Sequence, residues 1–231
     1  MKERIIVLQH VAIIPDGNRR WAKKHGLTRW ISHRKAGDYN NLILLFNEAK
    51  NLDIKYLSIW GFSTENWKRT KTEVNEILKV ISKGIDDATE KADENRTCFK
   101  HIGRKDRLPK DLIRKLENLE QVTKKFKSNF VLLCLDYGGR DETIRTVNKL
   151  LNKKLKKINE KKFPSYLDTA GIPNPDLIIR TGGEKRLSGF MPYQSDYAEL
   201  YFTDVYFPDF RPKELKEAVE EFSRRQRRFG R

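Results

Sequence analysis

The sequence has few cysteines and no long hydrophobic run. Its only cysteines, Cys98 and Cys134, fall in strand-like segments without metal-ligand spacing. We therefore expect buried, reduced thiols, as is usual in the cytosol. No apolar run approaches the ~20 residues that span a bilayer, and the N-terminus has neither the apolar stretch nor the small-residue cleavage site of a signal peptide. These absences predict a cytoplasmic protein.

Familiar nucleotide-binding and nucleophile motifs are also missing. There is no P-loop and no GxGxxG after a strand. The glycine-rich turns carry Thr, Glu and Arg, so no Ser or Cys stands in a nucleophile elbow. The sequence thus offers no sign of a P-loop NTPase, a dinucleotide-binding enzyme or a serine hydrolase.

Positive charge is in large excess. Lys and Arg number 48 against 32 Asp and Glu, a net charge of +16. Such an excess suits nucleic acid, an anionic membrane surface or polyphosphorylated ligands. The densest basic run, Lys153 to Lys162, is interpreted as the solvated end of a helix and the loop after it. Nucleic-acid binding would require a basic face with exposed stacking aromatics or a groove helix. Because the aromatics fall mostly in strand-like segments, we do not expect a nucleic-acid partner.

Strand-like and helix-like segments alternate along the chain. Strands are predicted over 11–14, 56–62, 98–102, 130–135, 177–179 and 200–202. Helices are predicted over 33–51, from a capping box at Thr70–Glu73 through Ile85, from Pro109 to Leu119, from Ile144 to Leu151, and from Pro212 to the C-terminus. This alternation predicts one α/β domain over residues 1–231, with a mainly parallel six-stranded sheet flanked by helices.

The first predicted strand leads directly into charged residues. After Val11 to Ile14 come Pro15, Asp16 and Gly17, and then Arg19 and Arg20. Ligands bind at the carboxyl ends of strands in open α/β sheets, and a helix start there offers N–H groups to an anion. The arginines add positive charge, and the Asp16 carboxylate could hold a metal. The segment predicts a site for a phosphate or diphosphate carried with a divalent cation.

Three further polar segments follow predicted strands: residues 63–69, 137–141 and 180–188. In the last of them, Gly182-Gly183 would let backbone approach a ligand, Arg180 and Arg186 could grip phosphate oxygens, and Ser188 could donate a hydroxyl. A glycine turn with two solvated arginines is the alternative interpretation. A second arginine set, Arg19, Arg20 and Arg69, favours phosphate binding. Two such sets indicate two phosphorylated substrates, or one with phosphates far apart.

Taken together, these segments resemble the cis-prenyltransferases, the family of undecaprenyl diphosphate synthase and dehydrodolichyl diphosphate synthase. The resemblance runs from His10 to Gly230. It rests on HVAIIPDGNRRWA (10–22), SHRKAG (32–37), GFSTENWKR (61–69), YGGRDE (137–142), RTGGEKRLSGF (180–190) and YAELYFTDVYFPDF (197–210). Pro15, Arg19 and the Gly61-Phe62 pair resemble the archaeal-type and eukaryotic forms.

The resemblance implies a fold, a reaction and partners. The fold is an α/β sheet whose helices enclose an apolar tunnel, usually in a homodimer. The reaction joins isopentenyl diphosphate to an allylic diphosphate such as farnesyl or geranylgeranyl diphosphate. Each addition makes a Z double bond, releases diphosphate and requires Mg²⁺. The polyprenyl product would be a lipid-carrier precursor, and the basic surface could give peripheral contact with anionic lipid.

The resemblance also implies residue roles. Asp16 matches the catalytic aspartate that holds Mg²⁺ and diphosphate, Asn66 the proton acceptor or relay, and Glu199 the second Mg²⁺ ligand. The allylic diphosphate loop corresponds to Gly17, Asn18, Arg19 and Arg20, with Trp21, Arg29 and His33 nearby. The second loop corresponds to Ser63, Thr64, Glu65, Trp67 and Arg69. The isopentenyl diphosphate site corresponds to Arg180, Arg186, Leu187 and Ser188. Arg228 and Gly230 match a C-terminal RxG motif expected to reach the diphosphate across the dimer.

A non-catalytic partner subunit of the same fold is the alternative. Such subunits lack several catalytic motifs, whereas Asp16, Asn66, Arg180, Arg186 and Glu199 are all present here. The sequence therefore favours a self-sufficient enzyme.

Overall fold

Six strands form one parallel sheet at the centre of the molecule. The computed structural model describes residues 8–153 and 157–225. Its strands are β1 (His10–Ile14), β2 (Tyr56–Ser63), β3 (Cys98–Ile102), β4 (Phe130–Tyr137), β5 (Leu177–Arg180) and β6 (Glu199–Phe202). They lie in the order β3-β4-β2-β1-β5-β6, and every neighbouring pair is parallel. The predicted α/β fold with a six-stranded sheet is confirmed.

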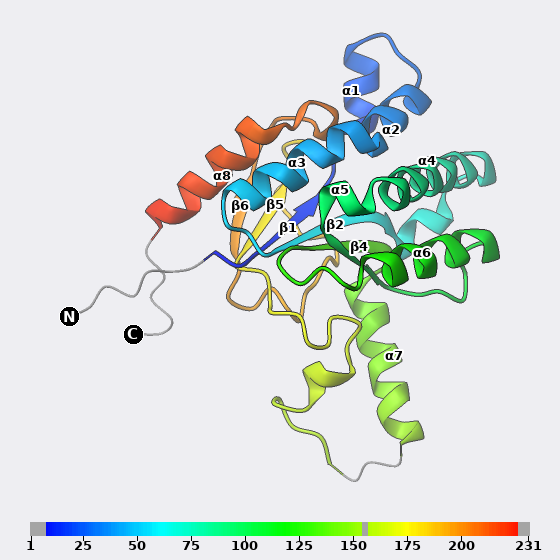
Figure 1. Ribbon diagram of the computed structural model, residues 1–231, viewed down its shortest axis with the longest axis vertical. Coiled ribbons are helices and arrows are strands. Elements are labelled where there is room, and N and C mark those ends of the chain that lie inside the picture. The colour runs from blue at the N-terminus through cyan, green and yellow to red at the C-terminus, as the bar shows by residue number, and fades with distance from the viewer. Residues whose placement is uncertain (1–7, 154–156, 226–231) are drawn as a thin grey trace.

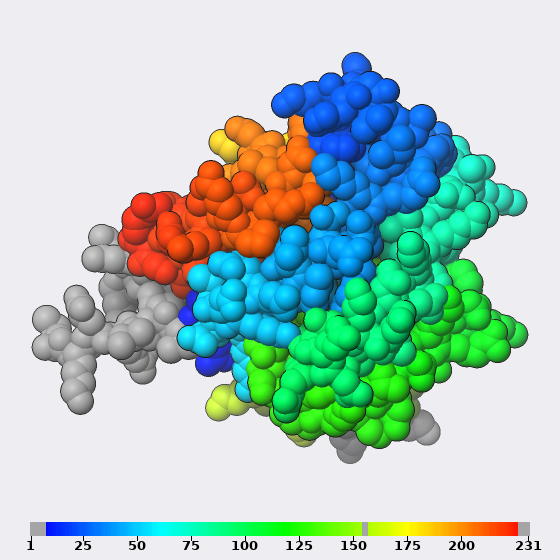
Figure 2. All heavy atoms as spheres, turned by 45° about the horizontal axis from the view of Figure 1, so that its top comes forward, coloured from blue at the N-terminus to red at the C-terminus, as the bar shows by residue number. Residues whose placement is uncertain are grey.

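Helices cover the sheet (Figure 1). They are α1 (Asn18–Lys24), α2 (Arg29–Gly37), α3 (Tyr39–Asn51), α4 (Lys71–Glu90), α5 (Ala92–Asn95), α6 (Lys110–Thr123), α7 (Gly139–Asn152) and α8 (Pro212–Arg224). Short 3₁₀ helices are η1 (Thr64–Lys68), η2 (Phe163–Tyr166) and η3 (Phe207–Asp209). On the face shown in Figure 2, α3 lies beside α8.

The strands contribute alternate side chains to two apolar cores. Val11, Ile13 and Ile59 belong to the larger core, which also contains buried residues of α3, α4, α6 and α8. Ala12 and Ile14 belong to a second core on the other face of the sheet. Because both faces are covered, these strands read as continuous hydrophobic runs in the sequence.

The strand order brings three carboxyl ends together. β1 lies between β2 and β5, so the segments that follow Ile14, Ser63 and Arg180 start side by side at one edge of the sheet. Parallel pairing fixes this arrangement because every strand then ends at the same edge. The polar segments at 15–20, 63–69 and 180–188 therefore meet, as the sequence predicted.

Three predicted helix boundaries change. The helix expected over 33–51 is two helices, because Asp38 is extended and its side chain caps α3 by accepting the Asn40 N–H. α7 ends at Asn152, so the basic run from Lys153 follows the helix, and its described residues 157–162 are exposed. The last helix is described over Pro212–Arg224; residues 226–231 lie outside the described ranges.

The cysteine prediction is confirmed within the described residues. Cys98 and Cys134 are both free and buried, and burial raises the pKa of each thiol. Across residues 8–153 and 157–225, no helix is long and apolar enough to cross a membrane.

A buried histidine makes stability depend on pH. His10 bonds through Nε2 to Ser58 Oγ at 2.8 Å and through Nδ1 to the Pro173 carbonyl at 2.7 Å. Burial lowers the pKa of His10 to about 4. Because the unfolded chain takes up a proton first as the pH falls, we expect the free energy of unfolding to drop between pH 6.5 and 4. His10 alone would contribute up to about 3 kcal/mol of that drop.

Urea unfolding at several pH values measures this drop. His10→Gln, which keeps a polar partner for Ser58, should show a shallower loss of stability than the wild type over the same window. His33 and His101, whose pKa values burial also lowers, contribute to the slope that remains. Equal slopes in the two proteins would contradict the assignment.

Candidate active site

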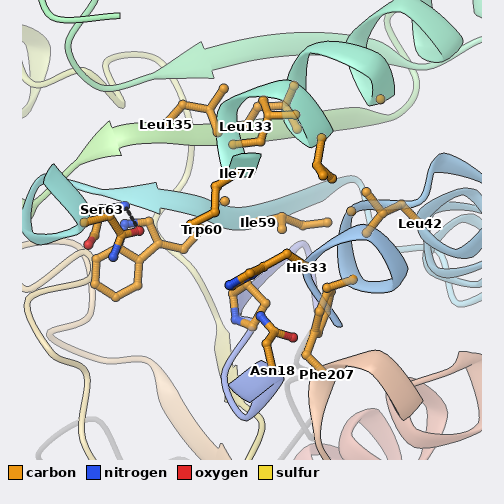
Figure 3. A pocket seen from close by; sticks show the side chains of 18 of the residues that line it. Asn18, His33, Leu42, Ile59, Trp60, Ser63, Ile77, Leu133, Leu135 and Phe207 are labelled. Atoms are coloured by element: carbon orange, nitrogen blue, oxygen red, sulfur yellow. Dashed lines mark hydrogen bonds between the residues drawn. The ribbon is translucent and has the colours of Figure 1, made fainter. Parts of the chain in front are cut away.

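A cavity of about 390 Å³ lies between the sheet and helices α2, α3 and α4. Apolar side chains such as Leu42, Ile59, Ile77 and Leu133 line much of it (Figure 3). Along α4 it extends from Ile77 to Ala88, a helical rise of about 16 Å. The polar mouth, at the carboxyl edge of the sheet, consists of Asp16, Asn18, His33, Ser63, Glu65, Asn66, Arg69, Arg180 and Ser188. The site is an apolar tunnel with a polar entrance that carries two arginines and two carboxylates.

Asp16 follows β1 and lies among cationic and N–H donors. Its Oδ2 accepts a hydrogen bond from Arg180 Nη2 at 2.8 Å, and its Oδ1 accepts one from the Gly17 N–H at 2.5 Å. Oδ1 also lies 3.4 Å from Arg20 Nη2. Burial alone would raise the pKa of Asp16, but the hydrogen bonds from Arg180 and Gly17 outweigh it and hold that pKa below its ordinary value. Asp16 is therefore an ionised carboxylate at neutral pH.

Backbone contacts fix the position of Asp16. The Thr181 hydroxyl accepts from the Asp16 N–H and donates to the Asp16 carbonyl, both at 2.8 Å. Gly17 has φ +94°, and a Cβ there would lie 2.5 Å from Cδ1 of Tyr206. A Cβ at Gly182, whose φ is +84°, would lie 3.0 Å from Gly17. Gly182 thus serves a close approach between the loops after β1 and β5.

Arg180, the last residue of β5, is 5% exposed and largely engaged within the protein. Besides Asp16, it donates to Ser188 Oγ at 2.8 Å and to the Arg186 carbonyl. Its buried Nε has no hydrogen-bond partner among the described residues, and that N–H is a donor available to a ligand. Arg180 therefore positions Asp16 and Ser188 and keeps one unused donor.

Two carboxylates connect the arginine sets. Glu184 accepts from Arg20 Nη1 at 3.1 Å and from Arg186 Nη1 at 2.5 Å. Asp16 contacts both Arg20 and Arg180. The two sets that the sequence separated are therefore joined at one place.

The second loop enters the mouth through η1. Asn66 Oδ1 accepts the Ser63 N–H at 3.0 Å and closes a capping box at the start of η1. Asn18 and His33 also line this end of the cavity (Figure 3). Asn18 Oδ1 and His33 Nε2 are both buried without a hydrogen-bond partner in the described structure. Because burial lowers the pKa of His33 to about 4, its ring is neutral at neutral pH. These unpaired atoms suit a polar ligand at the mouth.

Sequence reasoning missed Glu73. The Thr70–Glu73 pattern was interpreted as a capping box, and Thr70 Oγ1 does accept the Glu73 N–H at 3.3 Å. The Glu73 carboxylate, however, accepts hydrogen bonds from Arg19, Arg29 and Arg69. The signal that could have revealed it is charge: three arginines of predicted binding loops require an anion when they converge.

Other predicted residues support the site from outside the cavity. Trp21 is buried and donates through Nε1 to Asp209 Oδ2 at 2.7 Å. Trp67 donates through Nε1 to Asp136 Oδ1 at 2.8 Å, packs edge-on against Phe62 and thereby fixes η1. Leu187 packs against the second core. Gly17, Arg19, Arg20, Arg29, Thr64 and Arg186 likewise lie outside the cavity lining.

The structure does not bring Glu199 beside Asp16 within the chain. Glu199 opens β6 and pairs in register with Leu177, which in turn pairs with Val11. It is therefore level with the start of β1, about 16 Å along the strand direction from Asp16. Its carboxylate contacts Arg225 Nη1 at 3.1 Å. Arg228 and Gly230 lie outside the described residues.

The described residues contain no cluster of three or more His, Cys, Asp or Glu side chains that could hold a metal. Asp16 brings an ionised carboxylate into the mouth, in contact with Arg20 and Arg180. Mg²⁺ is often held by one or two carboxylates together with substrate phosphates, so this donor set fits a metal that arrives with a diphosphate.

Comparison with known proteins gives the family. Residues 14–230 match the prenyltransferase family model described as undecaprenyl diphosphate synthase. The chain is 43% identical to an isoprenyl transferase of Aquifex pyrophilus, covering 96% of each chain. It is 38% identical to the geranylgeranyl-diphosphate-specific tritrans,polycis-undecaprenyl-diphosphate synthase of Pyrococcus furiosus, covering 98% of this chain and 88% of that one. These identities do not single out the archaeal relatives.

Solved structures agree. The chain is similar to the lavandulyl diphosphate synthase of Lavandula x intermedia in complex with dimethylallyl diphosphate, with a TM-score of 0.92, 34% identity and coverage of 96% and 98%. It is similar to a probable undecaprenyl diphosphate synthase of Campylobacter jejuni, with a TM-score of 0.82, 34% identity and coverage of 97% and 99%. The chain is a prenyltransferase and belongs to the undecaprenyl diphosphate synthase family of cis-prenyltransferases.

Proposed function

We propose that this prenyltransferase condenses isopentenyl diphosphate with an allylic diphosphate, farnesyl or geranylgeranyl diphosphate, to a Z-polyprenyl diphosphate that serves as a lipid-carrier precursor. The observation that carries the proposal is the junction of two environments: a polar mouth at the carboxyl edge of the sheet, lined by Arg69 and Arg180, opens into an apolar tunnel. An allylic diphosphate has the same two parts, an anionic head and a hydrocarbon tail.

The charged mouth supports the ionisation of the primer. Negative charge grows on the diphosphate as the allylic C–O bond breaks, and fixed donors aimed at that charge stabilise the transition state more than the ground state. Arg20 and Arg69 provide charge at the mouth, and Arg180 keeps its buried Nε–H. Holding both substrates in register removes an entropic barrier of about 7–11 kcal/mol.

Mg²⁺ belongs to the proposal with Asp16 as its protein ligand. The metal would supply charge neutralisation at the diphosphate. Asp16 suits this role because it is ionised at neutral pH and fixed by Thr181 and Gly17. Glu199 lies at the opposite edge of the sheet. A role as second Mg²⁺ ligand would therefore not involve direct contact with Asp16 of the same chain.

Asn66 is suited to orienting a proton path. A neutral amide is a poor base, and Asn66 Oδ1 already accepts the Ser63 N–H. In this proposal its NH₂ group orients the released diphosphate or a relay that removes the proton from C2 of the isopentenyl unit.

Incorporation of labelled isopentenyl diphosphate tests the function. We expect a label extractable into organic solvent when the protein, Mg²⁺ and either farnesyl or geranylgeranyl diphosphate are present, and loss of that product when EDTA replaces Mg²⁺. Chromatography of the dephosphorylated product gives chain length and primer preference. Absence of extractable product with both primers would overturn the proposal.

Self-association is the proposed quaternary state. Ile144, Val147 and Leu151 form an apolar stripe on α7, and the outer two are 62% and 69% exposed. Such a stripe of exposed apolar side chains is typical of an interface, and a second copy of this chain is the partner that the family resemblance implies.

We expect a dimer by sedimentation, and a monomer when Ile144→Lys and Leu151→Lys are combined. Leu44→Lys, on exposed α3 surface, is the matched control and should stay dimeric.

A further inference from the structure

Glu73 lies under the cationic side of the mouth, at the start of α4. Its side chain is 2% exposed. Oε1 accepts hydrogen bonds from Arg19 Nη2 at 2.5 Å and Arg69 Nη1 at 3.0 Å, and Oε2 accepts one from Arg29 Nη1 at 3.4 Å. Its own carboxylate is absent from the cavity lining, whereas Arg69 contributes to that lining. One buried anion thus collects guanidinium groups from three separate parts of the chain.

Charge in this cluster is not balanced. Three guanidinium groups and one carboxylate leave two positive charges, and His33, whose Nε2 lies 3.8 Å from Glu73 Oε1, is neutral at neutral pH. A purely structural ion pair would need one arginine for one buried carboxylate. Arg69 brings part of this surplus charge into the mouth, where the carboxylates of the lining are Asp16 and Glu65.

The arginines also keep unused donors. A guanidinium group has five N–H donors in a fixed planar fork, and each of these three spends one in the contacts to Glu73. The side chain of Arg19 is 56% exposed, that of Arg29 46% and that of Arg69 30%. The carboxylate therefore holds one N–H of each guanidinium group, and the remaining N–H groups of these partly exposed side chains are left to meet solvent or a ligand.

We propose that Glu73 is a positioning residue for the allylic diphosphate: it holds Arg19, Arg29 and Arg69 in place so that their remaining N–H groups receive the anionic head. This inference rests on the proposed function. Without the carboxylate, three like charges would repel one another and their side chains would separate. The fork geometry that a diphosphate requires would then have to be built at the moment of binding, and affinity would fall.

Three variants test the proposal. Glu73→Gln removes the charge at nearly constant volume, and Glu73→Asp keeps the charge but shortens its reach. Glu76→Gln, on the same helix and paired with exposed Lys79, is the matched control. The readouts are KM for farnesyl diphosphate, KM for isopentenyl diphosphate, kcat, and calorimetric affinity for inorganic pyrophosphate.

For Glu73→Gln we expect KM for farnesyl diphosphate to rise about tenfold or more, with KM for isopentenyl diphosphate within about twofold. Pyrophosphate should bind correspondingly more weakly, Glu73→Asp should recover part of the loss, and Glu76→Gln should match the wild type. If Glu73→Gln does not fold, Glu73→Asp carries the same comparison of the two KM values.

Two results would overturn the proposal. Tighter pyrophosphate binding in Glu73→Gln would mean that the carboxylate merely opposes the anion. An equal change for both substrates, or a lower melting temperature with both KM values unchanged, would mean that Glu73 is only structural. Because calorimetry with pyrophosphate needs no turnover, a wild type without prenyl transfer would refute the proposed function and still leave the role of Glu73 tested.

Discussion

Asp16→Asn should lower kcat by about 10²–10³, the usual cost of removing one preorganised charged group from a transition state. Asparagine keeps an oxygen for the Gly17 N–H but removes the charge that faces Arg180 and the proposed Mg²⁺. Arg180 would stay buried without its counter-ion, which should cost about 1–3 kcal/mol of stability. Steady-state turnover and urea unfolding of the same protein measure the two effects.

The pH dependence of stability gives an independent check on Asp16. Because the pKa of Asp16 is lowered in the folded protein, its ionised form stabilises the fold above the unfolded-state pKa of about 4, and that stabilisation is lost as the pH falls through the folded-state value. Asp16→Asn should lack this acid-sensitive component. Asp111→Asn, which removes an exposed carboxylate from α6, should leave both turnover and the pH profile unchanged. Turnover of Asp16→Asn within threefold of the wild type would exclude a catalytic role.

Phe99→Ala should lengthen the product and destabilise the protein by about 3–5 kcal/mol. Phe99 is the second residue of β3, so it lies toward the amino edge of the sheet, away from the polar mouth. It lines the cavity and meets Phe46 edge-on, with ring centroids 6.0 Å apart. Removing the ring opens space at the deep end of the tunnel, where the tail of a growing chain would arrive.

Mass spectrometry of the polyprenyl product measures this change, and thermal unfolding measures the destabilisation. Phe99→Leu, a smaller change, provides the same comparison if the alanine variant does not fold. Phe130→Ala is the matched control: Phe130 stacks on Tyr56 and packs against the opposite core, outside the cavity. An unchanged product distribution in folded Phe99→Ala would show that the deep end of the tunnel does not limit chain length.

The sequence predicted the sheet well because its strands are buried on both faces. Val11 to Ile14 and Leu177 to Ile179 are apolar runs that must be buried in whatever register the strands pair. These two strands could therefore be predicted from their apolar residues alone. The break at Asp38 was missed because the predicted helix was extended back to His33, although its apolar spacing begins only at Leu42 and the Asp38 side chain caps the start of α3. Polar loops after adjacent parallel strands then had to share an edge, which is why Asp16, Asn66 and Arg180 were correctly placed together.

Side-chain direction was harder to predict than position along the chain. Glu73 satisfied a capping pattern, and nothing local showed that its carboxylate would turn to three arginines. Arg19 likewise turns to Glu73 instead of joining Asp16. For Glu199 a usable signal existed, because the first residue of a parallel strand lies at the amino edge. Trp21 and Trp67 matched family motifs, yet their indole N–H groups serve Asp209 and Asp136.

If the enzyme acts as proposed, the two shared carboxylates link its two substrate-binding sites thermodynamically. Asp16 contacts Arg20 and Arg180, and Glu184 contacts Arg20 and Arg186. A ligand that draws Arg20 away from these acids changes the field at the other two arginines. Whatever factor the first substrate imposes on the affinity of the second, the second must impose on the first. The order in which the two substrates bind therefore depends on their association and dissociation rates, whereas the coupling free energy between them is the same for either order.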